Sequence, residues 1–148
     1  MTRPRWSNDH ALLAAVAKHL VPIETEEMRQ LVTAGHVGRP TGLAHVRAMR
    51  AVATGWTALA AIEPEPPHLY DGDQGGAWPF ERRQALERAL KGAQARAAGD
   101  PHDPELAGIA DAVATLIWWE TADPSARFLV DTTIAWRTRP ALTLGVAA

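Results

Sequence analysis

The first apolar residues of the chain recur at the spacing of a helix. Leu12, Val16 and Leu20 are each four positions apart, so they would share one helix face. Ser7 precedes this stripe, and its hydroxyl can accept a hydrogen bond from a free backbone N–H at a helix N-terminus. Proline inside a helix removes a backbone hydrogen bond, so we expect this helix to end before Pro22. The pattern therefore predicts a first helix that begins after Ser7 and ends near Leu20.

Two further helices are predicted in the first half of the chain. Thr25 is followed by two glutamates, whose charge suits the positive end of a helix dipole, and this predicts a short second helix that runs toward Gly35. The third predicted helix covers residues 41–62 and is the longest. Its apolar residues lie on more than one face, and it has no charge after Arg50. This is the pattern of a buried helix at the centre of a fold.

The second half is predicted to hold a long loop and three more helices. Residues 63–79 contain four prolines and three glycines, which predict a loop. A polar helix follows over residues 80–98, and Asp103 and Asp123 each precede a proline, as an N-cap precedes the first helical residue. The apolar tail at 138–148 alternates like an extended segment laid on the body or on a partner. We therefore expect one all-α domain that spans the chain, with six helices in an orthogonal or bundle-like arrangement.

Length and composition narrow the class of protein. The chain has 148 residues, of which 47% are hydrophobic, and its net charge of -2 provides no overall field for nucleic acid or an anionic membrane. The absence of cysteine excludes disulfides, thiolate catalysis and cysteine-ligated zinc. The longest uncharged run, residues 51–62, is too short to cross a bilayer, and no apolar signal segment follows Met1. We expect a cytoplasmic protein without a membrane segment.

The residue types that usually carry catalysis are scarce. The two serines, Ser7 and Ser125, both stand at predicted helix starts, where a hydroxyl is normally occupied with backbone amides. No glycine-rich nucleotide-binding motif is present, and the six histidines include no pair at the spacing that holds zinc on one helix face. The sequence therefore predicts no catalytic residue and no cofactor, and it favours an interaction protein over an enzyme.

The densest polar cluster lies in the predicted loop. His68, Asp71 and Asp73 occur together, and Gly76 stands where a calcium loop has its turn glycine. The match fails at the last ligand position, which is Arg82 where a calcium loop has glutamate. One alternative function is therefore a small-molecule or metal-binding enzyme that uses residues 68–76, with His68 as base and the two aspartates as ligands.

A second alternative function is a DNA-binding regulator. Residues 25–50 can be two helices around a glycine turn, as in helix-turn-helix proteins. Arg39, His45, Arg47 and Arg50 would then form a basic face toward phosphates. However, the third predicted helix is long and apolar in its second half, as expected of a core helix.

Apolar residues on outward helix faces lead to the main functional hypothesis. In the fifth predicted helix Trp118 projects away from the apolar stripe and is followed by Trp119, and in the sixth Val130 and Ile134 point away from the inner face. Either the tail and the first helices cover these residues, or another subunit does. Tryptophan is favoured at interface centres because it brings a large area with few rotors. We therefore predict a homo-oligomer or a protein that binds another protein, as an adaptor, accessory subunit or inhibitor.

One acidic residue lies close to the predicted core. Glu120 stands at the end of the fifth predicted helix, on its apolar side. Burial of a lone carboxylate costs several kcal/mol unless the charge is paired. We therefore expect Glu120 to meet an arginine, and the candidates are Arg47, Arg50 and Arg137.

Overall fold

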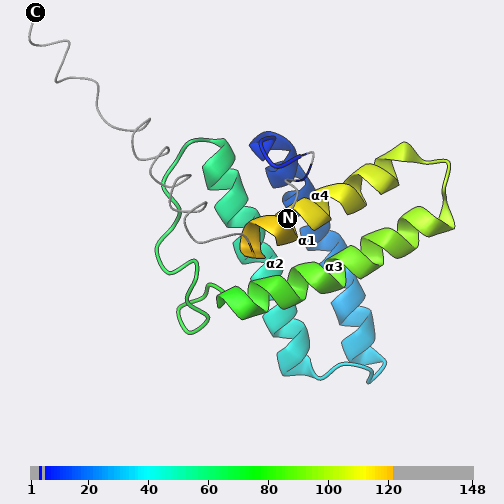
Figure 1. The fold of residues 1–148 in the computed structure, drawn as a ribbon. Helices are drawn as coiled ribbons and strands as arrows, with labels where there is room; N and C mark the ends of the chain where they lie inside the picture. Colours follow the sequence, from blue (N-terminus) through cyan, green and yellow to red (C-terminus); the bar gives the residue numbers. More distant parts are fainter. Residues whose placement is uncertain (1–3, 5, 122–148) are drawn as a thin grey trace, which may run out of the picture.

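The computed structural model describes residues 4 and 6–121, and within them every regular element is a helix. The helices are α1 (His10–Thr33), α2 (Arg39–Ala60), α3 (Pro79–Gly99) and α4 (Pro104–Thr121). α1 and α2 form one antiparallel pair, and α3 and α4 form a second pair that crosses the first (Figure 1). The predicted all-α, bundle-like fold is thus confirmed for this part of the chain. None of these four helices is long and apolar enough to span a membrane.

The described residues hold fewer helices than the sequence predicted. The helix expected between Ser7 and about Leu20 and the helix expected from Thr25 onward are one continuous helix, α1. The described residues therefore hold four helices where five of the expected six were predicted. The third, fourth and fifth predicted helices correspond to α2, α3 and α4. The sixth predicted helix, with Val130 and Ile134, and the tail at 138–148 lie outside the described residues.

Pro22 lies inside α1 instead of ending it. Its ring removes the N–H that would bond to the carbonyl of Lys18, which weakens the helix at this point. On either side, however, α1 contributes to the interior: Leu20 is buried in the core, and Glu24 is bonded to His45 of α2. Tertiary packing supplies most of the stability of a helix in a protein, so contacts before and after Pro22 outweigh the lost bond.

One predicted helix start is confirmed and another is displaced. Asp103 accepts a hydrogen bond at Oδ1 from the backbone N–H of Glu105 at 2.9 Å, directly before α4, as predicted. α1 is capped by Asp9, whose carboxylate accepts from the N–H of Leu12 at 3.1 Å. The expected cap, Ser7, lies two residues earlier and is buried. The cap of α4 was therefore predicted correctly, whereas the prediction of Ser7 as the cap of the first helix was wrong in residue and in position.

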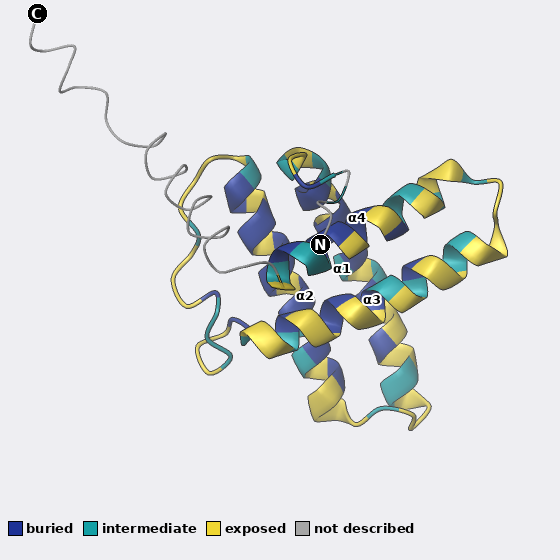
Figure 2. Cartoon of the chain, in the orientation of Figure 1, coloured by how far each residue is buried: buried dark blue, intermediate teal, exposed yellow. Residues whose placement is uncertain are grey.

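α2 is the long buried helix that the sequence predicted, and it buries more residues than any other described helix (Figure 2). It packs against both α1 and α3. Every helix contributes to one core, in which Leu20, Met49, Leu86 and Leu116 are fully buried. Each such side chain stabilises the fold by about 1.5–3 kcal/mol. Because α2 and α3 both pack into this core, their positions relative to each other are fixed.

The segment between α2 and α3 is packed against the helices. Leu69 and Ala77 are buried, and the N–H of Ala77 donates to the carbonyl of Leu69 at 3.0 Å. A Cβ at Gly76 would collide with the carbonyl oxygens of His68 and Leu69, so only glycine fits there. Arg47 of α2 donates from Nε to the carbonyl of Gly76 at 2.9 Å. These contacts fix the loop against the face of α2.

Candidate functional site

The two tryptophans predicted at a partner surface occupy different environments. Trp119 is 6% exposed, donates from Nε1 to the carbonyl of Ser7 at 3.0 Å, and packs edge-on against Trp56 with ring centroids 5.9 Å apart. Trp118 is partly buried and contacts Trp119, with centroids 5.1 Å apart. Trp119 is therefore a core residue, because its indole is enclosed by the N-terminal segment and α2. Of this pair, only Trp118 reaches the surface.

His68, Asp71 and Asp73 do not form a metal centre. Oδ1 of Asp71 accepts from the N–H of Asp73 at 2.8 Å, so this carboxylate stabilises its own turn. His68 and Asp73 are exposed. Within residues 4 and 6–121, no group of three or more His, Cys, Asp or Glu side chains could hold a metal ion. The geometry of the loop therefore gives no support to the metal-enzyme alternative.

The four residues of the predicted basic face are divided between surface and interior. Arg39 and Arg50 are exposed on α2. His45 is only 6% exposed and is bonded to α1, whereas Arg47 is partly buried in contacts with the loop and α3. Two of the four side chains are thus committed to contacts within the chain. The structure does not bring the four together as an open basic face for DNA.

Glu120 meets an arginine, as the sequence predicted, but the partner is Arg82 of α3. Nε and Nη2 of Arg82 donate to Oε1 of Glu120 at 3.1 and 2.7 Å. The Arg82 side chain is fully buried, and its guanidinium lies 4.6 Å from the ring centroid of Tyr70. The pair therefore joins α3, α4 and the loop. Of the expected partners, Arg47 pairs with Glu81 instead and Arg50 is exposed, whereas Arg137 lies outside the described residues.

A second buried polar pair joins α1 to α2. Nε2 of His45 lies 2.9 Å from Oε2 of Glu24, and the two side chains are 4% and 2% exposed. An ionised carboxylate can only accept, so we assign the proton of this bond to Nε2. The other carboxylate oxygen, Oε1 of Glu24, is buried and has no hydrogen-bond partner among the described residues.

The larger of two cavities beside α2 lies between α2 and α3, and we call it the α2–α3 cavity. Its volume is about 850 Å³, and both apolar and charged side chains line it. His45 lines it from α2, and Phe80, Arg88 and Lys91 line it from α3. Phe80 is 55% exposed, so the cavity has an open apolar side as well as charged groups.

The smaller cavity lies between α2 and the loop, and we call it the α2–loop groove. It measures about 520 Å³ and is lined by Leu43 of α2 together with Pro66 and Pro67 of the loop. Arg47 lines this groove and donates from Nη2 to Oε2 of Glu81, which lines the α2–α3 cavity, at 2.6 Å. This ion pair separates the two cavities.

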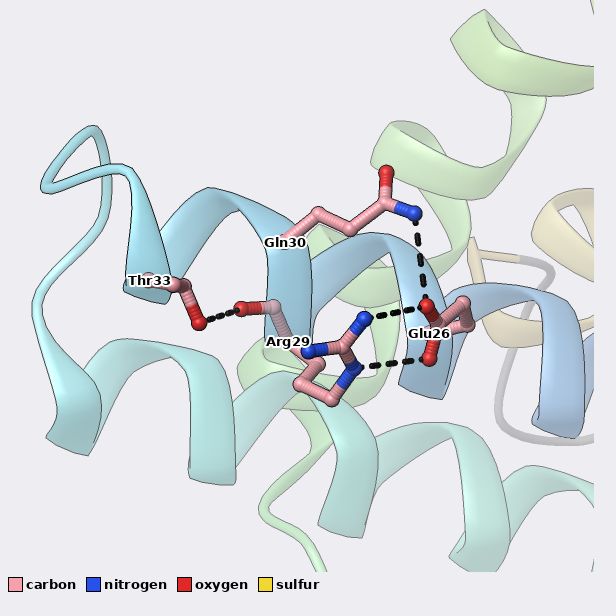
Figure 3. A network of polar contacts seen from close by, with 4 residues as sticks. All are labelled: Glu26, Arg29, Gln30 and Thr33. Atoms are coloured by element: carbon pink, nitrogen blue, oxygen red, sulfur yellow. Dashed lines mark hydrogen bonds and ion pairs between the residues drawn. The ribbon is translucent and has the colours of Figure 1, made fainter.

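A fourth polar group lies on the outer face of α1. Arg29 donates to Glu26 from Nε at 2.9 Å and from Nη2 at 2.6 Å, and Gln30 donates to the same carboxylate at 3.3 Å (Figure 3). The hydrogen bonds from Arg29 lower the pKa of Glu26 from 4.5 to about 2, and the carboxylate raises the pKa of Arg29. Both side chains are exposed to water. This group is a solvated helix face and offers no enclosed site.

The buried Glu24 and His45 pair was missed, although the sequence contains a signal for it. The apolar stripe that ends at Leu20 in our prediction continues at the same spacing through Glu24 to Met28, and both of these residues are buried. A carboxylate on an apolar stripe indicates a buried polar partner, because an unpaired one would be costly. The signal was hidden because Pro22 predicted a helix end.

Comparison with known proteins gives no match to a family model, to a curated protein or to a solved structure.

Proposed function

We propose that the protein is not an enzyme and acts by binding another protein chain, as an oligomeric adaptor, accessory subunit or inhibitor. The partner that we assign is a second copy of the chain, and the contact surface is the α2–loop groove. The observation that supports this is the exposure of Leu43, which is 60% accessible although it lines a groove. Leu43 lies in this groove with other apolar residues, and an exposed apolar patch with a polar edge is typical of protein-binding surfaces.

The surroundings of Leu43 also suit a protein interface. Apolar residues of the groove come from two elements, with Val46 on α2 and Pro66 and Pro67 on the loop. The exposed Arg50 lies on the edge of the same groove, as polar groups surround the apolar centre of most interfaces. Contacts of one surface with the same surface of a second copy are the commonest way in which soluble proteins associate.

The tryptophan surface expected from the sequence stays a prediction. Trp118 is the member that reaches the surface among the described residues, and it packs on the buried Trp119. A contact through Trp118 would therefore lie over the core, away from Leu43. The groove and Trp118 are separate candidates that one experiment can distinguish.

The experiment is a measurement of molar mass by light scattering at about 100 µM, since association depends on concentration. We expect a mass above one chain for the wild type and a shift to monomer in Leu43→Asp, because a charge in an apolar contact is costly to bury. The matched control is Ile62→Asp, which changes another exposed apolar residue just beyond the opposite end of α2.

Two outcomes would contradict this proposal. A monomeric wild type would remove self-association as the function. Dissociation by Trp118→Asp, with Leu43→Asp unchanged in mass, would move the interface from the groove to the tryptophan surface. Circular dichroism of each variant shows whether the helices are retained.

A further inference from the structure

We propose that the α2–α3 cavity is a binding site for a small carboxylate attached to an apolar body. This goes beyond the protein-binding proposal, because the cavity lies on the other side of the Arg47–Glu81 ion pair from Leu43. The cavity combines two cations, a buried imidazole and an exposed aromatic ring.

The two cations on α3 are available to a ligand. Arg88 and Lys91 line the cavity three residues apart, so they lie on neighbouring turns of one helix face. Neither forms an ion pair with any residue in the described part of the chain. The hydrogen-bond contact of Arg88 is Sδ of Met28 at 3.7 Å, and a thioether is a weak acceptor. Two cationic donors at a concave surface that form no ion pair within the described residues suit an anionic ligand.

His45 places a polar group at the inner wall of the cavity. Its side chain is 4% exposed, and Glu24 holds the ring through Nε2 at 2.9 Å. The second ring nitrogen, Nδ1, makes no hydrogen bond within the described residues. Glu24 does not line the cavity, so the imidazole of His45 lies between the Glu24 carboxylate and a bound ligand. A fixed ring at the inner wall gives a bound ligand a rigid surface to pack against, and the acid group is left to Arg88 and Lys91.

The remaining lining explains why the ligand should have an apolar body. Phe80 is 55% exposed at the cavity, and Pro40 and Ala44 line it from α2. Small-molecule sites usually combine a mostly apolar lining with a few charged groups that fix orientation. An aromatic or aliphatic carboxylate would place its acid near Arg88 and Lys91 and its apolar part against Phe80.

Two glutamates also line the cavity, and one of them provides a further test of the proposal. Glu81 is neutralised by Arg47, with 2.6 Å between Nη2 and Oε2. Glu87 has no ion pair among the described residues and would repel an anion. An anion site therefore predicts opposite effects for neighbouring residues of α3: loss of a cation weakens binding, and loss of the Glu87 charge strengthens it.

The test uses benzoate as the probe, with benzamide as its uncharged counterpart and inorganic phosphate as an anion without an apolar body. Binding is followed by NMR through the ring protons of His45 and Phe80. We expect benzoate to shift both sets of signals in a saturable way. Benzamide should bind at least about tenfold more weakly, because it lacks the charge-assisted bonds.

Variants then assign the effect to this cavity. The double variant Arg88→Gln with Lys91→Gln should weaken benzoate binding at least about tenfold. Glu87→Gln should strengthen it. The matched control is Lys18→Gln with Arg83→Gln, which removes two exposed cations outside the cavity and should leave binding unchanged. These positions are exposed, so the core is not altered.

Several results would overturn the proposal. They are the absence of a saturable shift at His45 up to about 10 mM benzoate, an equal loss in the control double variant, or weaker binding in Glu87→Gln. Phosphate binding as tight as that of benzoate would overturn the apolar part of the assignment. Leu43→Asp should leave benzoate binding unchanged, so a failure of this site and a failure of the protein-binding proposal can be told apart.

Discussion

The interior between α3 and α4 and the outer face of α1 contain the same chemical pair in different surroundings. Arg82 and Glu120 approach to 2.7 Å with side chains 0% and 7% exposed. Arg29 and Glu26 approach to 2.6 Å with side chains 63% and 53% exposed. The distances are alike, so the contact geometry does not separate them. The two pairs differ in burial. Burial determines the cost of losing one partner, because water can replace a lost partner only at the surface.

Two other pairs lie between these extremes. His45 and Glu24 are almost as buried as Arg82, but a single hydrogen bond joins them. Arg47 and Glu81 form a half-buried pair that also holds the loop. The position of a charged residue in the fold therefore determines what its loss costs, and the four pairs should respond in a graded order.

The largest effect is expected at Glu120. Glu120→Ala leaves the buried guanidinium of Arg82 without an acceptor, and this should lower the free energy of unfolding by about 3–5 kcal/mol. Urea denaturation at pH 7 measures it. The double variant Arg82→Met with Glu120→Leu should recover most of the loss, because no buried charge remains. A loss below about 1 kcal/mol in Glu120→Ala would mean that this pair contributes no more to stability than a surface ion pair does.

A smaller loss is expected at Glu24. Glu24→Leu removes the acceptor of the His45 Nε2 proton inside the protein, and the free energy of unfolding should fall by about 1–3 kcal/mol. Denaturation in urea measures this as well. Adding His45→Leu should restore part of the stability, since both polar groups are then gone. If the double variant is less stable than the single one, the pair is not the reason for the loss.

The half-buried pair should respond locally. Arg47→Gln removes the bonds to Glu81 and to the carbonyl of Gly76, so hydrogen exchange at the amide of Ala77 should become at least about tenfold faster. Amides in the core of α2 should keep their protection. The control is Arg50→Gln, an exposed arginine of the same helix, which should change neither. Equal acceleration in both variants would mean that Arg47 does not hold the loop.

The smallest effect is expected at Glu26. Its pKa is lowered to about 2, so the ionised form stabilises the folded state above pH 4.5, and this contribution is lost as the pH falls from 4.5 toward 2. Arg29→Ala should bring the pKa of Glu26 back toward 4.5, as measured by NMR titration of its carboxyl carbon. Unfolding at pH 7 should hardly change, because both groups are solvated. A pKa that stays near 2 without Arg29 would assign the shift to another group.

Local signals in the sequence were sufficient for the class of fold and for some helix ends. The spacing of apolar residues predicted a helix in each region where the structure has one, and the aspartate and proline at Asp103 predicted the start of α4 correctly. The cost of a lone buried carboxylate predicted an arginine beside Glu120. These inferences succeeded because each depends on residues that are close together in the chain. A cap lies within one turn of the helix start, the apolar spacing repeats along a single helix, and the cost of a buried charge concerns one residue.

Other features depended on which elements meet in space. Pro22 stays helical because α1 contributes to the interior on both sides of it, and Arg82 is the partner of Glu120 because α3 packs beside α4. The crossing of the two helix pairs places His45 at the wall of a cavity and Trp119 in the core. For residues 4 and 6–121, the sequence by itself determined a helical fold with one strongly buried central helix. Only the tertiary structure decided the partner of each polar group, because that choice joins residues far apart in the chain.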